Sequence, residues 1–145
     1  MCTICGAVFA NPRPTQDELD RYYAAEYREQ VQGTAKPKDS NLREEGTRSN
    51  RLHWFIRRFT SSVKNHMDIG SSAGLLLAEI QSDYLCHSVG IEPGDAFRDF
   101  ADENIKAAGG NVVFYKRLDE APDEVYDLIT ISHVLEHLTD PLGYL

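Results

Sequence analysis

A glycine-rich turn between a short apolar strand and a helix constrains the fold of this chain more than any other feature of its sequence. Residues 66–69 (HMDI) have a strand pattern, residues 70–74 (GSSAG) form the turn, and a helix is expected over Leu75–Gln81. Glycine lets the backbone turn tightly and approach a ligand closely, because it has no Cβ atom. The segment therefore predicts a strand–turn–helix unit of the kind that builds a parallel sheet.

Strands and helices continue to alternate after this unit. Further strands are expected at Cys86–Glu92, Asn111–Lys116 and Tyr126–Ser132. A helix is expected from Asp95, which could cap its start, to about Ala108, where Gly109 ends it. This order predicts the α/β class, with a mostly parallel sheet of about four strands flanked by helices.

The N-terminal third predicts a helical extension in front of the sheet. Thr15, with Glu18 three residues later, is typical of a capping box. The helix that follows carries an apolar face made of Leu19, Tyr22, Tyr23 and Tyr27.

A polar loop is expected over Gly33–Asn41, followed by a second helix over Thr47–Thr60. The apolar stripe expected on this helix consists of Leu52, Phe55, Ile56 and Phe59. We accordingly expect two parts, an N-terminal leader at residues 1–46 and the partial α/β domain at residues 47–145.

Composition and charge exclude several classes of protein. The chain is 41% hydrophobic and carries a net charge of −8, so a disordered chain is not expected. Residues 67–145 hold 15 acidic and 4 basic side chains, which argues against a nucleic-acid partner. There is no apolar run long enough for a membrane helix, and three cysteines favour a reducing, cytoplasmic location over a disulfide framework.

The turn at residues 70–74 also predicts a nucleoside-binding site. The start of the following helix offers free N–H groups to a carboxylate or phosphate, and Glu92, at the end of the next strand, could accept both ribose hydroxyls. The dinucleotide pattern G-x-G-x-x-G fails at Leu75. The alternative pattern D/E-x-G-x-G-x-G matches at Asp68, Gly70 and Gly74, while Ser72 replaces the middle glycine and fits best with a negative φ.

Three motifs in order resemble those of class I S-adenosylmethionine-dependent methyltransferases. They are the turn at residues 68–74, the segment 89–93 (VGIEP), and the segment 126–129 (YDLI) with 133–138 (HVLEHL). The resemblance implies a Rossmann-like domain that uses S-adenosylmethionine and acts on a small-molecule acceptor. It assigns cofactor binding to Asp68, Gly70, Ser71, Ser72, Gly74, Glu92, Pro93, Arg117, Leu118 and Ser132, and it places His133 where the methyl group leaves.

Other interpretations stay open at this point. His133 could act as a general base or could only shape the pocket. The segment 133–137 (HVLEH) also matches the H-x-x-E-H zinc-peptidase pattern, although no third ligand follows it. Cys2 and Cys5 open a segment that resembles the zinc-ribbon leader of some methyltransferases, but we expect no metal in this chain. A non-catalytic nucleoside- or NAD-binding module and a zinc-ribbon interaction protein are the alternatives.

The resemblance also implies a seven-stranded sheet, of which this sequence supplies about four strands. We therefore expect a fragment whose fourth strand is an edge, with Leu128, Ile129 and Ile131 uncovered on one side. Such an edge favours a homodimer, or burial of the edge under the N-terminal helices.

Overall fold

A computed structural model describes the chain except for residues 7, 9–11, 28–29, 31–32, 34–35 and 145. The leader motif and the loop expected at Gly33–Asn41 therefore lie partly outside the described residues. The first described helix is α1 (Gln16–Arg21), which continues as a π-helical turn, η1 (Tyr22–Glu26).

Four parallel strands form the sheet, in the order β3-β2-β1-β4. The strands are β1 (Asn65–Ile69), β2 (His87–Ile91), β3 (Val112–Tyr115) and β4 (Leu128–Ile131). The central strand β1 pairs with β2 on one side and β4 on the other, with Met67 opposite Val89 and Ile129. The expected number and direction of the strands are confirmed, and β2, β3 and β4 are each one or two residues shorter at their ends than expected.

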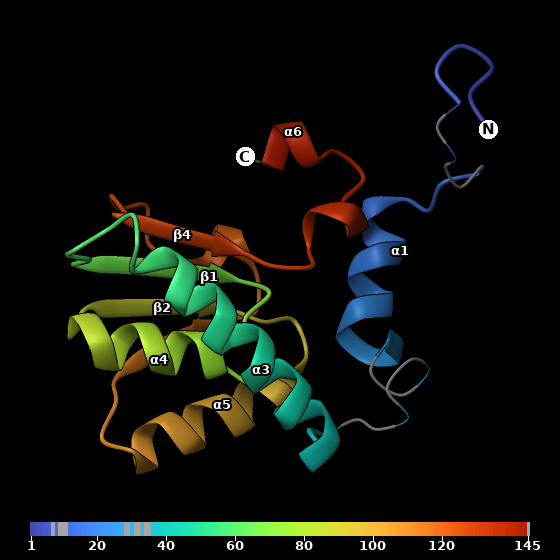
Figure 1. The fold of residues 1–145 in the computed structure, drawn as a ribbon. Helices are drawn as coiled ribbons and strands as arrows, with labels where there is room; N and C mark the ends of the chain where they lie inside the picture. The colour runs from blue at the N-terminus through green and yellow to red at the C-terminus, as the bar shows by residue number, and fades with distance from the viewer. Residues whose placement is uncertain (7, 9–11, 28–29, 31–32, 34–35, 145) are drawn as a thin grey trace.

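Helices cover one face of this sheet. The helices α3 (Asp39–Ile56), α4 (Leu75–Tyr84) and α5 (Asp95–Ala107) lie together in front of the strands in Figure 1. A core of Ile56, Val63, Leu76, Ile80 and Cys86 forms beneath α3 and α4. Because side chains alternate along a strand, the polar residues His66 and Asp68 of β1 face this helical layer, while Met67 and Ile69 face the other side.

The opposite face of the sheet is covered by C-terminal segments. Met67, Ile69, Val89 and Ile91 form a buried cluster there. The side chains packed against this cluster include Leu118 of η2 (Leu118–Glu120) and Tyr144 of α6 (Pro141–Tyr144). A further short turn, η3 (Leu135–His137), follows β4. The loops after β3 and β4 thus replace a helical layer on this side.

Two helix starts differ from the sequence-based prediction. Helix α3 begins at Asp39 rather than Thr47, after Asn41 Oδ1 accepts a hydrogen bond from the Lys38 N–H (3.2 Å), so it spans the boundary expected between residues 46 and 47. The division into domains remains a prediction. Helix α5 is capped by the backbone of Gly94, and Asp95 is its first residue instead of its cap, because its carboxylate pairs with Arg98 (2.6 Å).

The apolar stripe predicted for α3 is wrong at two positions. Ile56 is buried and Leu52 packs against the core, but Phe55 and Phe59 are 54% and 74% exposed and contact each other instead, with ring centroids 4.8 Å apart. The helix turns a polar face to α4, which the aromatic positions alone could not predict.

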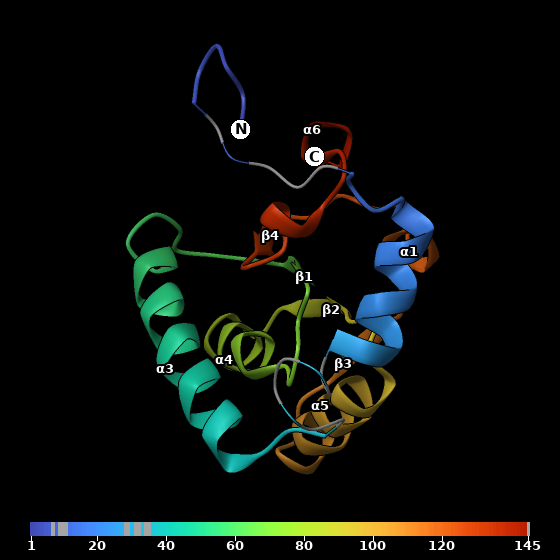
Figure 2. The same ribbon diagram turned by 90° about the vertical axis from the view of Figure 1, so that its right-hand side faces the viewer.

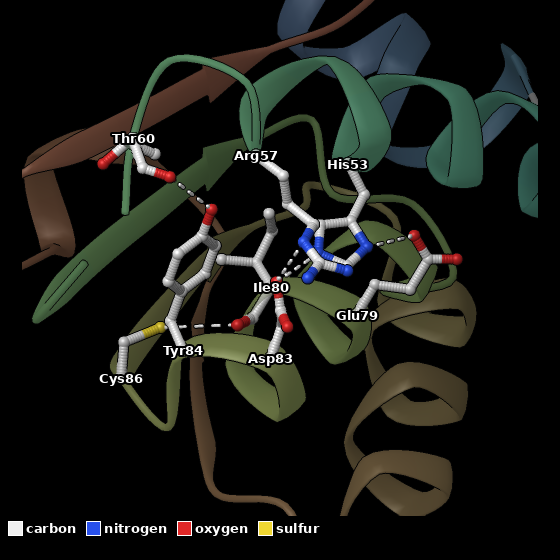
Figure 3. A network of polar contacts seen from close by, with 8 residues as sticks. All are labelled: His53, Arg57, Thr60, Glu79, Ile80, Asp83, Tyr84 and Cys86. Carbon is white, nitrogen blue, oxygen red and sulfur yellow. Dashed lines mark hydrogen bonds and ion pairs between the residues drawn. The ribbon is translucent and has the colours of Figure 1, made fainter. Parts of the chain in front are cut away.

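Figure 3 shows this polar contact between α3 and α4. His53 Nε2 and Arg57 Nε both reach Asp83 Oδ2, at 3.0 and 3.2 Å, and His53 Nδ1 lies 3.5 Å from Glu79. Beyond the end of α3, the Tyr84 hydroxyl donates to the Thr60 carbonyl (3.1 Å). These contacts hold α3 along α4, so that the N-terminal half of α3 lies beside the glycine turn.

Strand β4 lies at the edge of the sheet, as expected, but it is less uncovered than expected. Leu128 packs against the core under α3, and Ile131 packs against the opposite cluster. Only Ile129 has a mostly open side chain, with 53% of its surface exposed.

Helix α1 stands apart from the sheet, beyond the carboxyl ends of the strands (Figures 1 and 2). Its capping box is confirmed, since Thr15 and Glu18 exchange hydrogen bonds of 2.8 and 3.3 Å. Its polar contacts with the sheet domain reach the segment after β4, where Thr139 Oγ1 donates to Gln16 (2.7 Å). Among the described residues, no helix is both long and apolar enough to cross a bilayer.

Candidate functional site

The glycine turn is locked onto the end of β2 by its own backbone. The N–H groups of Gly70 and Ser71 both donate to the Ile91 carbonyl, at 2.8 and 3.0 Å. Gly70 and Gly74 have φ values of +78° and +76°, in the left-handed region that favours glycine. Ser72 also has a positive φ, +51°, so the negative φ with which a serine would fit best here is not adopted. The loop thus keeps a glycine-like path and strains this serine.

Glu92 stabilises the strained backbone of Ser72 and connects the glycine turn to the end of β2. Its side chain is buried, with 3% of its surface exposed. Oε2 accepts a hydrogen bond from the Ser72 N–H (2.9 Å), and Oε1 accepts one from the Gly94 N–H (2.8 Å). One carboxylate therefore fixes both the glycine turn and the start of α5. Carboxylate oxygens have further lone pairs, so the same group can still accept from a ligand.

The N–H group of Leu75, the first residue of α4, is not free, contrary to the sequence-based expectation. The buried carboxylate of Glu45, on α3, lies 3.4 Å from the N–H groups of both Ala73 and Leu75. Burial raises the pKa of Glu45, while these contacts and a hydrogen bond from the Ser72 side chain oppose the shift. A residue of the predicted leader thus occupies the anion site of the helix start.

Sequence reasoning missed Glu45, although a signal was present. Glu45, Ser49, Leu52 and Ile56 are spaced by four, three and four residues, so they share one helical face. A carboxylate on the stripe that packs inward needs a partner, and the glycine turn supplies its N–H groups.

Asp68 lies beneath the turn rather than in the open site. It is buried, and Thr130 Oγ1 on β4 donates to its Oδ1 (2.6 Å). Burial, together with the negative charges of Glu45 and Glu92, raises its pKa to about 7, although the Thr130 hydrogen bond opposes the rise. Asp68 thus connects the central strand β1 with the edge strand β4 beneath the glycine turn.

The same threonine contacts a buried histidine. His66 Nε2 lies 2.9 Å from Thr130 Oγ1, while its Nδ1 has no partner among the described residues. Desolvation lowers the pKa of His66 to about 4, so its ring is neutral at physiological pH. Because Thr130 donates its one proton to Asp68, the hydrogen bond from His66 requires the proton on Nε2. Nδ1 is then an unprotonated nitrogen without a hydrogen-bond partner among the described residues. Burying an unpaired acceptor of this kind costs less free energy than burying an unpaired N–H donor.

A large cavity of about 1060 Å³ is lined by residues that follow the carboxyl ends of the strands and by residues of α3 and α1. Its lining includes eight of the residues singled out from the sequence, namely Gly70, Ser72, Glu92, Pro93, Arg117, Leu118, Ser132 and His133. Asp68 and Ser71 line only a separate cavity of about 30 Å³, which has room for about one water molecule. Gly74 lines neither, and its Cβ position lies 2.8 Å from the Ala101 side chain.

The segment after β4 forms one wall of the large cavity. His133 has a positive φ of +58°, and its side chain is 65% exposed with Nδ1 3.6 Å from Glu136. The next residue, Val134, lies against Gly70, where a Cβ atom would meet its Cγ2 atom. His137 faces α1 and stacks against Tyr23, with ring centroids 5.4 Å apart.

The metal interpretations find no support in this arrangement. The described residues contain no group of three histidine, cysteine or acidic side chains placed to hold a metal ion. Hydrogen bonds from the backbone of Cys5 and Ile4 lower the pKa of the Cys2 thiol. Residues 7 and 9–11 of the leader lie outside the described part of the chain, so the zinc-ribbon resemblance stays a prediction.

Comparison with known proteins identifies the family. A family model described as a methyltransferase domain matches residues 20–145. The chain belongs to this methyltransferase family. The match includes η1 and α3, so the family pattern extends into the predicted leader. No curated protein sequence matches the chain.

Solved structures share the fold of this methyltransferase domain. The plantazolicin methyltransferase BpumL, solved with S-adenosylhomocysteine (SAH), is similar at a TM-score of 0.59 and 14% identity, over 86% of this chain and 49% of that one. The N-methyltransferase NodS of Bradyrhizobium japonicum, also with SAH, gives 0.51 and 21%, over 84% and 58%. The YcgJ protein of Bacillus subtilis gives 0.52 and 22%, over 61% and 40%. The chain thus spans about half the length of these proteins.

Proposed function

We propose that this domain binds S-adenosylmethionine and transfers its methyl group to a small molecule. The observation that carries the proposal is Glu92, a buried carboxylate that lines the large cavity and fixes the glycine turn beside it. A cavity of about 1060 Å³ exceeds the roughly 300–1000 Å³ of most small-molecule sites, so a cofactor and a small acceptor fit together. The SAH complexes of BpumL and NodS add support from the same fold.

The residues of the cavity fit the parts of this cofactor. Glu92 would accept hydrogen bonds from the ribose hydroxyls, and Gly70 and Ser72 would pass under the methionine part. Pro93, Arg117 and Leu118 would lie near the adenine, and Ser132 near the reacting end. The bound cofactor supplies an electrophilic methyl group on a sulfonium, and the protein positions the acceptor in line with it.

Arg48 is the residue that we assign to the cofactor's carboxylate. Glu45 already occupies the start of α4, so that site cannot receive a second anion. Arg48 lies nearly one helical turn after Glu45 on α3 and lines both the large and the small cavity. Its guanidinium can pair with a carboxylate in two parallel hydrogen bonds.

We propose that His133 takes up the proton that the substrate loses when it accepts the methyl group. His133 lies at the carboxyl end of β4, on the wall of the cavity, with a largely exposed imidazole. Glu136, 3.6 Å from Nδ1, would orient the ring so that the other nitrogen faces the cavity. A neutral imidazole can take a proton from the acceptor as the new bond forms.

Calorimetric titration tests the function. We expect SAH to bind this protein with a fitted stoichiometry of one, and NAD to show no saturable heat. S-Adenosylmethionine should compete with SAH for the same site. Tight binding of NAD with no response to SAH would contradict the proposal and favour a dinucleotide-binding module.

We also propose that the protein self-associates through β4, and that it acts in the cytoplasm. Ile129 is the mostly exposed apolar side chain of this edge strand. Replacing it with lysine, Ile129→Lys, should shift the protein toward the monomer in size-exclusion chromatography with light scattering, because edge charges block strand pairing. Val125→Lys is the control, since Val125 is 82% exposed but lies outside the strand. A wild-type monomer at all concentrations would contradict the association.

A further inference from the structure

The large cavity has an aromatic wall away from the glycine turn. Tyr23 and Tyr27, from η1 and the residue after it, line the cavity, and their ring centroids lie 5.0 Å apart. His137, from the segment after β4, contacts Tyr23 with the two ring planes tilted by 54°, and Tyr144 of α6 also lines the space. Two segments that are far apart in the sequence thus bring aromatic rings to one cavity.

The charges around this wall are predominantly negative. The carboxylates of Asp20, Glu44 and Asp140 line the cavity. Two of the four cations that line the cavity are paired with carboxylates, because Arg117 holds Asp119 in two hydrogen bonds of 2.9 and 3.0 Å and Lys116 lies 3.7 Å from Asp95. The other two are Arg21, whose Nε donates to the Asp17 carbonyl (3.2 Å), and Arg48. Over the whole described lining, six carboxylates face four basic side chains. An anionic acceptor would meet net repulsion here, and a cation would meet net attraction.

We infer that the methyl acceptor is an amine, held as its ammonium form between the tyrosine rings and the carboxylates of this cavity. The inference rests on the proposed methyltransferase function and names its substrate class. Aromatic rings attract ammonium groups electrostatically, through the negative face of the ring. Neutral phenols and alcohols would gain neither this attraction nor that of the carboxylates.

The chemistry balances with the groups that the site holds. The bound ammonium first gives one proton to a ring nitrogen of His133 and becomes a neutral amine. The nitrogen lone pair then forms the bond to the methyl carbon while the carbon–sulfur bond breaks, and that electron pair stays on sulfur. The products are SAH and a methylated ammonium, so the positive charge moves from sulfur to nitrogen.

A matched series of probes tests the charge preference by binding alone. We would titrate the SAH-saturated protein with choline, with its neutral isostere 3,3-dimethylbutan-1-ol, and with the anion 3,3-dimethylbutanoate. Choline should bind at least about 5-fold tighter than the neutral probe, and the anion should bind weakest. Equal affinity for choline and the neutral probe would overturn the inference.

Substitutions at Tyr23 and Asp20 test whether the side chains around this cavity cause the preference for choline. Tyr23→Leu and Asp20→Asn should each reduce the preference for choline over the neutral probe about 2-fold or more, whereas Tyr23→Phe, which keeps the ring, should retain it. Asp17→Asn is the matched control, because Asp17 lies on the same helix but does not line the cavity. A preference that is unchanged in both Tyr23→Leu and Asp20→Asn would contradict the inference.

The two proposals fail in different ways. Loss of choline preference with intact SAH binding contradicts the amine acceptor and leaves methyl transfer standing. If SAH does not bind, the proposed function is wrong, and the same probes are then titrated into the free protein. Preference for choline there supports a cation site in the cavity, and its absence overturns the inference as well.

Discussion

Replacing Glu92 with alanine is expected to weaken SAH binding by about 1–3 kcal/mol, which is roughly 5- to 150-fold in affinity. The change removes the acceptor that we assign to the ribose hydroxyls. It also releases the N–H groups of Ser72 and Gly94, which the carboxylate holds at 2.9 and 2.8 Å. Since Ser72 has a positive φ, losing this hydrogen bond should let the turn leave its glycine-like path. Isothermal titration with SAH measures the effect.

Two further variants keep this test decisive. Glu92→Asp retains the charge but is one methylene shorter, so it cannot reach both N–H groups and should bind SAH more weakly than wild type even if alanine disrupts folding. Asp95→Asn, three residues later, removes a carboxylate that does not line the cavity and should bind SAH like wild type. Wild-type affinity in both Glu92 variants would show that the ribose lies elsewhere.

The second large effect concerns the pH dependence of folding in the variant Asp68→Asn. In wild type the pKa of Asp68 is about 7 in the folded state and close to 3.8 when unfolded, so the folded state holds this proton more tightly. Its contribution to stability is therefore full below about pH 4 and is lost as pH rises through 7. At about 1.4 kcal/mol for each pKa unit, the loss amounts to about 4 kcal/mol.

His66 acts in the opposite direction over nearly the same range. Its pKa falls from 6.5 when unfolded to about 4 when folded, so the unfolded chain takes up the proton first. Its contribution is present above pH 6.5 and is lost as pH falls through 4, by about 3 kcal/mol. In wild type the two buried groups largely offset each other, although they contact the same threonine.

Asp68→Asn should remove the Asp68 contribution to the pH dependence of stability and leave that of His66. Asparagine keeps an oxygen that can accept from Thr130 but has no proton to lose. The free energy of unfolding of the variant, relative to wild type, should therefore rise by about 3 kcal/mol between pH 4.5 and pH 7.5. Urea denaturation at several pH values measures this difference.

Asp127→Asn provides the control. Hydrogen bonds from the Asn65 and Lys64 backbones lower the pKa of Asp127, so its contribution is complete above pH 4 and should not change between pH 4.5 and 7.5. A parallel pH dependence for Asp68→Asn and Asp127→Asn would mean that Asp68 is ionised in the folded protein throughout this range.

Much of the cofactor half of the site could be predicted from local sequence patterns. Strand periodicity placed β1, β2, β3 and β4, and the connection lengths are those of parallel crossovers. The glycines at 70 and 74 and the carboxylate at the end of β2 follow from positions along single strands. Consecutive parallel strands bring these positions to one edge of the sheet without further information.

The remainder depends on contacts between segments that are far apart in the sequence. Phe55 and Phe59 follow a helical stripe, yet they are exposed, because α4 offers Glu79 and Asp83 to the neighbouring face of α3. The leader residue Glu45 became part of the site only because α3 lies along α4. Sequence patterns report which face of a helix is apolar on average, and they do not report what the neighbouring element presents.

The sequence by itself determined the positions of the strands along the chain, the glycine turn and the place of Glu92, since each is a property of one strand and the few residues beside it. The tertiary structure alone decided the state of Asp68, the capping of α4 by Glu45 and the aromatic wall between Tyr23 and His137. Burial and through-space distance set these features, and both arise only when distant segments pack together.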